Sequence, residues 1–276
     1  MTINALRDIK FLRITKGRTS VRNALLTAHD PDTQLDLNQP AYIVTSQLRL
    51  LAAVTAVALR HTDARVDKLR AQGLEQAAID AALEDLSAGC DPFDATYPFM
   101  QRPVVPAHGP KDAARKLGPG EQPVKKLSPS MPPDDAEEYW NLANAERTSL
   151  PLADAILQLV VFHYLSMAGN NAYDGDKCQM GSPAMRFVGT GKAATEICVV
   201  HETLLDTLLS QIPTSWVHGA GLPAWADRRC EVSLTSESGR PEIHPLWAAT
   251  WSSNAPACYW EDERLTGVRT GGIPEP

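Results

Sequence analysis

Residues 40–62, PAYIVTSQLRLLAAVTAVALRHT, form the strongest helix signal in the sequence. The apolar and small side chains of this stretch cover nearly every face of the predicted helix, namely those of Leu48, Leu51, Ala52, Val54, Thr55 and Ala58. A helix that is apolar all round belongs in the interior of a protein. We therefore expect a domain packed around this helix.

A second buried helix is predicted over residues 149–168, with Ser149 or Thr148 as its cap and Pro151 in its first turn. Around these two helices we expect a strand over 9–14 with a turn at 15–18, a helix over 20–30 that is N-capped by Ser20, and a helix over 74–88. A further helix is expected over 194–213. Pro213 stops it, and its inward-facing residues are Leu204, Leu205, Leu208 and Leu209. The expected class is α+β, mostly helical with short strands and long irregular loops.

Residues 1–213 are expected to form the main domain, and residues 214–276 an irregular part of the same domain, rich in Trp and Pro. Within this second part, one or two short strands are expected, such as residues 229–235.

Composition narrows the functional classes. The chain has 276 residues, 43% of them hydrophobic, and a net charge of −7. This charge excludes a wholly basic nucleic-acid coat but not a local basic patch. No run of 18 apolar residues and no secretory signal pattern is seen, so we expect a cytoplasmic protein without a membrane span. Five scattered cysteines without a CxxC pair indicate reduced thiols, and the spacing that marks zinc modules is missing.

Catalytic motifs are missing from the sequence. It has no GxSxG, HExxH, P-loop or GxGxxG pattern. His163 lies in an apolar run and is best interpreted as a hydrogen-bonded core residue, whereas His201 with Glu202 is interpreted as a surface pair on a helix. The carboxylates of residues 134–140 are explained by an acidic helix N-terminus. We therefore predict no catalytic residue, no metal and no cofactor.

Two segments have the composition of binding loops. Residues 102–128 hold many prolines and glycines, and Arg102 to Lys126 include six basic residues against two acidic ones. Such a segment is either a solvated linker or a basic loop that faces phosphate. Residues 169–183 combine glycines, two asparagines, Tyr173 and Lys177 directly after the second buried helix. They are either a helix C-cap with an ordinary turn or a ligand-binding loop on a rigid scaffold.

Several segments together resemble one family. SVRNALLTAHD (20–30), LRLLAAVTAVAL (48–59), DPFDATYPFMQ (91–101), PVKKLSPSMP (123–132), LADAILQLVVFHYLSMAGN (152–170) and the block 181–213 follow the order found in the large subunit of the type I-E CRISPR surveillance complex, Cascade, the CasA family. Only PFMQ, residues 98–101, is distinctive by itself. The ordered set over residues 15–213 supports the resemblance.

The resemblance implies a role in which guide RNA reads the target by base pairing. The large subunit recognises the short protospacer-adjacent motif (PAM) in double-stranded target DNA, largely from the minor groove, and helps to start R-loop formation. The minor groove offers a degenerate code, which suits uncharged donors, backbone amides and apolar wedges. Other Cascade-type subunits and a CRISPR guide RNA are the implied partners in the prokaryotic cytoplasm, with a nuclease or transposition proteins downstream.

The resemblance also assigns contacts. For PAM binding it implies Gly169, Asn170, Asn171, Ala172, Tyr173, Gly175 and Lys177. For guide RNA or phosphate it implies Lys111, Arg115, Lys116, Lys125, Lys126, Tyr139, Trp140, Asn141 and Asn144. The family loop has more glycines than this one, so we expect a different motif preference here.

This sequence departs from the family in length. Typical members continue past this length with a lysine finger, a wedge hairpin and a four-helix bundle, so a shortened subunit lacking the bundle is expected. The alternatives are a purely structural subunit that caps a multi-subunit complex, and a metal-dependent hydrolase that would use His163 or His201.

Overall fold

The computed structural model describes residues 3–103, 124–127, 149–166, 171–173, 176–178, 198–227, 244–252 and 254–272. The described α-helices are α1 (Ala5–Asp8), α2 (Val21–Leu26), α3 (Ala41–Ala58), α4 (Val66–Gln72), α5 (Gln76–Asp85), α8 (Leu152–Leu165), α9 (Leu204–Gln211), α10 (Thr214–Val217) and α12 (Pro245–Thr250). The described 3₁₀ turns are η1 (Leu59–His61), η2 (Ser87–Gly89) and η3 (Val124–Leu127). The strands are β1 (Leu12–Ile14), β2 (Gly17–Thr19), β3 (Leu150–Pro151), β4 (Asn171–Tyr173), β5 (Asp176–Cys178), β6 (Asn254–Glu261) and β7 (Arg264–Gly272).

Helix α3 is the centre of the core, as residues 40–62 predict. Every residue from Leu50 to Ala58 is buried, and α3 contacts α2, α5, α8, α9 and α10. By length and composition, the helical stretch Ala41–His61 could cross a membrane, but 72% of its most apolar window is buried inside the structure. Core helices pass the same test, so this is weak evidence for a span.

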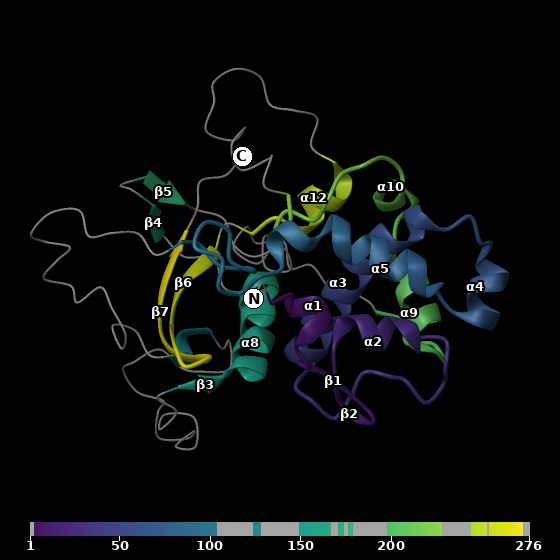
Figure 1. Ribbon diagram of the computed structural model, residues 1–276, viewed down its shortest axis with the longest axis horizontal. Helices are drawn as coiled ribbons and strands as arrows, with labels where there is room; N and C mark the ends of the chain where they lie inside the picture. Colours follow the sequence, from purple (N-terminus) through teal and green to yellow (C-terminus); the bar gives the residue numbers. More distant parts are fainter. Residues whose placement is uncertain are drawn as a thin grey trace, which may run out of the picture.

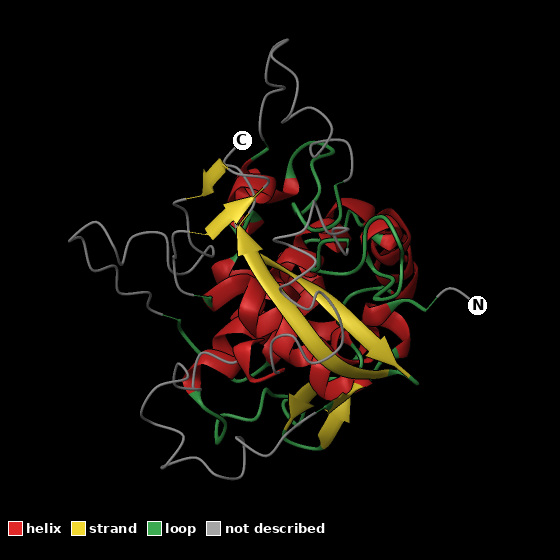
Figure 2. Ribbon diagram, turned by 90° about the vertical axis from the view of Figure 1, so that its left-hand side faces the viewer, coloured by secondary structure: helices red, strands yellow, loops and turns green. Residues whose placement is uncertain are grey.

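Helix α8 separates α3 from a long β-hairpin. It contacts α3 on one side, and it also contacts β6 and β7, which lie together at the left of Figure 1. In the view of Figure 2 the hairpin crosses in front of the helices. The described strands form three small antiparallel sheets, ordered β1–β2, β3–β7–β6 and β4–β5. The expected α+β class is confirmed.

The start of the chain follows the prediction with one shift. Ser20 caps α2, because its Oγ accepts a hydrogen bond from the backbone N–H of Asn23 at 3.3 Å. The predicted strand over 9–14 is limited to Leu12–Ile14, and Ile9 instead ends α1. The predicted turn joins β1 to β2 as a hairpin, with Ile14 opposite Gly17.

The predicted cap of α8 is wrong. Helix α8 begins after Pro151, which has no side-chain cap hydrogen bond. The Oγ of Ser149 instead accepts hydrogen bonds from the Arg264 guanidinium, from Nε at 3.1 Å and from Nη2 at 2.9 Å. The chain before α8 is thus drawn into strand pairing with β7, and Thr148 lies outside the described residues.

The helix predicted over 194–213 is shorter, because α9 begins only after Thr203. The Oγ1 of Thr203 accepts a hydrogen bond from the Asp206 N–H at 3.0 Å and so caps α9. Before this cap, Val199 and Val200 are 54% and 52% exposed, outside any helix. Of the four leucines expected to point inward, Leu209 is only half-buried. The helix ends at Gln211, close to the predicted stop.

The C-terminal part differs most from expectation. The sequence predicts an irregular segment over residues 214–276, but this segment contains α10, α12 and the longest strands in the described part of the chain, β6 and β7. The two strands pair from Asn254 with Gly272 to Glu261 with Arg264. The suggested strand at 229–235 lies outside the described residues. Because α8 packs on this hairpin, the hairpin is part of the same core.

Candidate nucleic-acid interface

The β6–β7 hairpin presents one face to the protein core. Cys258 and Val268 are paired across the strands and are 7% and 0% exposed. Burial raises the pKa of the Cys258 thiol and also that of the Tyr164 hydroxyl on α8. Both groups therefore stay neutral, and their positions are those of core residues rather than nucleophiles or acids.

The distinctive PFMQ segment packs on this hairpin and on the core behind it. Phe99 is fully buried, with its ring edge-on to Trp225 at a centroid distance of 5.6 Å. Met100 is buried at a positive φ of 52°, a left-handed conformation that non-glycine residues avoid. The side chain of Gln101 meets Trp260 on β6, whose indole Nε1–H donates to Gln101 Oε1 at 3.2 Å.

The basic segment 102–128 is attached to the hairpin at both ends. At its start, the backbone N–H of Arg102 donates to the carbonyl of Pro256 on β6 at 3.0 Å. Near its end, η3 contacts β7 and α8. Val124 and Leu127 of η3 are 2% and 0% exposed and belong to the hydrophobic core. A freely solvated linker would not bury both residues, so this part of the segment is an anchored one.

Strand β3 also pairs with this hairpin, Leu150 with Leu265 and Pro151 with Arg264 of β7. The predicted contacts Tyr139, Trp140, Asn141 and Asn144 lie in the sequence between η3 and β3, outside the described residues.

The predicted loop after α8 contains a second hairpin. Its two short strands pair in the register Asn171–Cys178, Ala172–Lys177 and Tyr173–Asp176, and neither interpretation of residues 169–183 included this β-structure. Strand β4 contacts β7, and Figures 1 and 2 both show β4–β5 near the end of the long hairpin that is remote from β3.

The structure thus brings together two groups of predicted contacts along one hairpin. Asn171, Ala172, Tyr173 and Lys177 lie on β4–β5, and Lys125 and Lys126 lie in η3 between its two buried residues. The other predicted contacts lie outside the described residues: Gly169, Asn170, Gly175, Lys111, Arg115, Lys116, Tyr139, Trp140, Asn141 and Asn144.

The histidines considered as alternatives have structural surroundings. His163 is a buried core residue, with Nε2 at 2.8 Å from the Thr250 carbonyl oxygen, as predicted. His201 is exposed, but it precedes α9 instead of lying on a helix, and its backbone N–H donates to Thr207 Oγ1 at 2.9 Å. Within the described ranges, no three His, Cys, Asp or Glu residues are grouped so that they could hold a metal ion.

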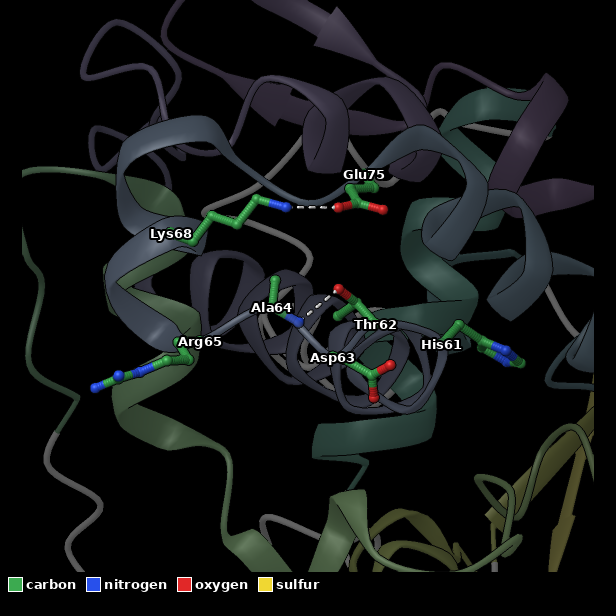
Figure 3. Close-up of a pocket in the computed structure, with 7 residues that line it drawn as sticks. All are labelled: His61, Thr62, Asp63, Ala64, Arg65, Lys68 and Glu75. Atoms are coloured by element: carbon green, nitrogen blue, oxygen red, sulfur yellow. Dashed lines mark hydrogen bonds and ion pairs between the residues drawn. The ribbon is translucent and has the colours of Figure 1, made fainter.

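A hollow of about 530 Å³ lies beside the start of α4, far from the hairpin (Figures 1 and 3). Its lining carries charges of both signs, and Lys68 and Glu75 pair across it at 3.1 Å between Nζ and Oε1. Figure 3 shows His61 and Arg65 pointing away from each other at its two sides. None of the predicted contacts lines this hollow, and its charged groups do not converge on one point.

Sequence reasoning missed the long hairpin as the platform of the site. The apolar run Ala255–Trp260 was a usable signal for a buried strand, but it contains Pro256, and its turn, Asp262–Glu263, lacks the glycine that usually marks a two-residue hairpin. For β4–β5 the signal was stronger, since Asp174–Gly175 between the two strands is a common hairpin-turn pair.

Known proteins share this fold. The chain superposes on Thermobifida fusca Cse1 with a TM-score of 0.67 and 17% identity, over 99% of this chain and 52% of that one. It superposes on Acidimicrobium ferrooxidans Cse1 with a TM-score of 0.64 and 18% identity, over 100% of this chain and 52% of that one. On a chain of a structure titled "CRISPR RNA-guided surveillance complex" it superposes with a TM-score of 0.67 and 16% identity, over 100% of this chain and 56% of that one. The chain thus spans about half the length of these structures.

The sequence comparisons give the family. No curated protein matches the sequence closely enough to report. The family described as CRISPR-associated protein Cse1 matches over residues 9–258, which is most of the chain and runs from before β1 into β6. The name Cse1 is also given as a synonym of CasA for a Thermus thermophilus structure with the same fold. On this match, the chain belongs to the Cse1 family of CRISPR-associated proteins.

Proposed function

We propose that this chain is the large subunit of an RNA-guided CRISPR surveillance complex. In that complex it recognises the PAM in double-stranded target DNA and helps to start R-loop formation. Its role is binding and not catalysis. Its partners are the other subunits of the complex, a guide RNA and the target duplex. Family membership and the shared fold with a chain of such a complex support this proposal.

The observation that carries the proposal is the shared platform. The basic segment starts on β6 and is anchored by η3 on β7, and β4 contacts the same strand. At about 3.3 Å per residue, strand β7 (Arg264–Gly272) is long enough to hold these segments at separate points along one edge of the molecule. Phosphate contacts and groove contacts would then be presented on one side.

The register of β4–β5 divides the predicted contacts. Since alternate residues of a strand share a face, Asn171 and Tyr173 belong to one face of the small hairpin, and Ala172 and its partner Lys177 to the other. We therefore assign groove reading to Asn171 and Tyr173 and a phosphate contact to Lys177. Uncharged polar and aromatic residues suit the minor groove, where the donor and acceptor pattern is degenerate.

The test uses the chain assembled with its partner subunits and a guide RNA. A duplex library randomised beside the target sequence first identifies the motif. Exchange of Asn171 and Tyr173 for alanine should then reduce the preference for motif-bearing duplex. The Lys125→Ala/Lys126→Ala pair should weaken binding to all duplexes alike and lower the salt slope by up to about two.

Two results would contradict the proposal. If the assembled complex shows no motif preference, the recognition role is wrong. If full DNA affinity and preference persist when residues 169–177 are replaced by a short Gly-Ser linker, the chain acts only as a structural end-capping subunit.

A further inference from the structure

Gln101 connects three separate parts of the chain through one side-chain amide. Its Nε2 donates to the carbonyl oxygens of Pro92 at 3.0 Å and Phe99 at 3.3 Å. Its Oε1 accepts a hydrogen bond from Trp260 Nε1–H at 3.2 Å. One half of the amide thus closes the loop 92–101 on itself, and the other half ties that loop to strand β6.

The residues around Gln101 aim it at Trp260. Phe99, two positions earlier, inserts into the core against Trp225, and Met100 between them has a φ of 52°. Such a conformation persists in a non-glycine residue only when its surroundings hold it. The turn at Met100 sends the two neighbouring side chains to different partners. The ring of Phe93 also contacts Trp260, edge-on at a centroid distance of 5.1 Å.

The position of Gln101 in the chain gives this contact a consequence for binding. The next residue, Arg102, bonds to β6 through its N–H and opens the basic segment 102–128. The amide therefore determines where the segment leaves the platform relative to β4 and η3. A binding loop whose origin is fixed loses less conformational entropy on binding.

We propose that Gln101 is a positioning residue for nucleic-acid binding: it holds the origin of the basic segment in register with the β4–β5 hairpin. This inference rests on the proposed function, because it takes the basic segment and the β4–β5 hairpin to be the parts of the chain that bind nucleic acid. Gln101 would act through other residues, because its three hydrogen bonds given above go to Pro92, Phe99 and Trp260.

The test compares two glutamines with similar local bonding. Gln101→Leu keeps the side chain's approximate size and removes all three hydrogen bonds. Gln39→Leu is the matched control, because Gln39 Nε2 also donates to two carbonyls, of Asp36 at 3.0 Å and Arg13 at 3.5 Å, but in the loop before α3. Trp260→Phe is a milder variant that removes the indole donor and part of the ring volume, leaves the two bonds from Gln101 Nε2 and keeps an aromatic ring beside Phe93.

Two readouts are taken: amide hydrogen exchange of residues 91–103 in the isolated chain, and motif preference and affinity in the assembled complex. For Gln101→Leu we expect faster exchange at Arg102 and a roughly tenfold loss of affinity for motif-bearing duplex. A tenfold change in affinity is about the size of the net contribution of one hydrogen bond. Trp260→Phe should change both in the same direction by less, and Gln39→Leu should change neither.

The outcomes separate the two proposals. Unchanged exchange at residues 91–103 in Gln101→Leu overturns the positioning role, whatever the DNA result. Faster exchange with unchanged affinity also overturns it, while the proposed function stands if the Lys125/Lys126 exchange still weakens binding. If the unmodified complex shows no motif preference, the proposed function fails, and the positioning role fails with it.

Discussion

The turn of the long hairpin yields a prediction with an unusual sign. Asp262 and Glu263 connect β6 to β7, and their φ angles are +49° and +57°. Positive φ at both central residues is the pattern of a type I′ turn, which favours Asn-Gly. Replacing Glu263 by glycine should therefore stabilise the protein, although glycine usually destabilises regular structure.

The magnitude follows from two opposing terms. A left-handed conformation costs an L-residue about 1–2 kcal/mol, which glycine does not incur. Glycine's extra freedom in the unfolded chain costs about 0.5–1 kcal/mol in return. The net gain in the free energy of unfolding is about 0.5–1 kcal/mol, which corresponds to a rise in Tm of about 1–3 °C for a chain of this size.

Thermal unfolding followed by circular dichroism measures this shift, with Glu84→Gly as the matched control. Glu84 is exposed and lies in the helical part of α5, so the same exchange there should lower the stability by about 0.5–1 kcal/mol. The two variants should move Tm in opposite directions. A Tm that falls in both would refute the turn geometry, and with it the strand register that places β7 beside η3 and β4.

Two further predictions concern the core behind the hairpin. Phe99→Ala should lower the free energy of unfolding by about 3–5 kcal/mol, because the ring is fully buried against Trp225, and Phe99→Leu should cost less than half of that; urea titration distinguishes the two. Burial raises the pKa of the Cys90 and Cys258 thiols, so both should resist iodoacetamide in the native protein even at pH 9, while the half-buried Cys198 is alkylated before either of them. Peptide mass spectrometry would contradict this if Cys258 reacted as fast as Cys198.

The sequence was most informative where one property decides the structure. The apolar faces of residues 40–62 lead directly to burial, and the hydroxyl of Ser20 before Val21 leads to a helix start. At Ser149 the same cap rule fails, because a distant partner, Arg264, competes for the hydroxyl. Local rules cannot include a guanidinium that lies 115 positions away in the chain.

In the candidate site, too, local features could be predicted from the sequence and tertiary contacts could not. The basic and the Gly/Asn-rich segments could be picked out by composition, but their common support could not. That support depends on β3 pairing with β7 and on β4 contacting it, and the partners in these two contacts come from well-separated parts of the chain. Pairings of this kind are set by tertiary packing and not by residue preference.

The PFMQ motif gains a different meaning from this arrangement. It was the most distinctive part of the resemblance, yet Phe99 and Gln101 contact Trp225 and Trp260 of this chain. The motif therefore reports how the platform is built, and under the proposed function the segments mounted on that platform would carry the contacts to nucleic acid. Relatives with the same motif could then share the fold while preferring different PAM sequences. The Asn171 and Tyr173 positions, where this chain departs from a glycine-rich loop, are where that preference should be altered first.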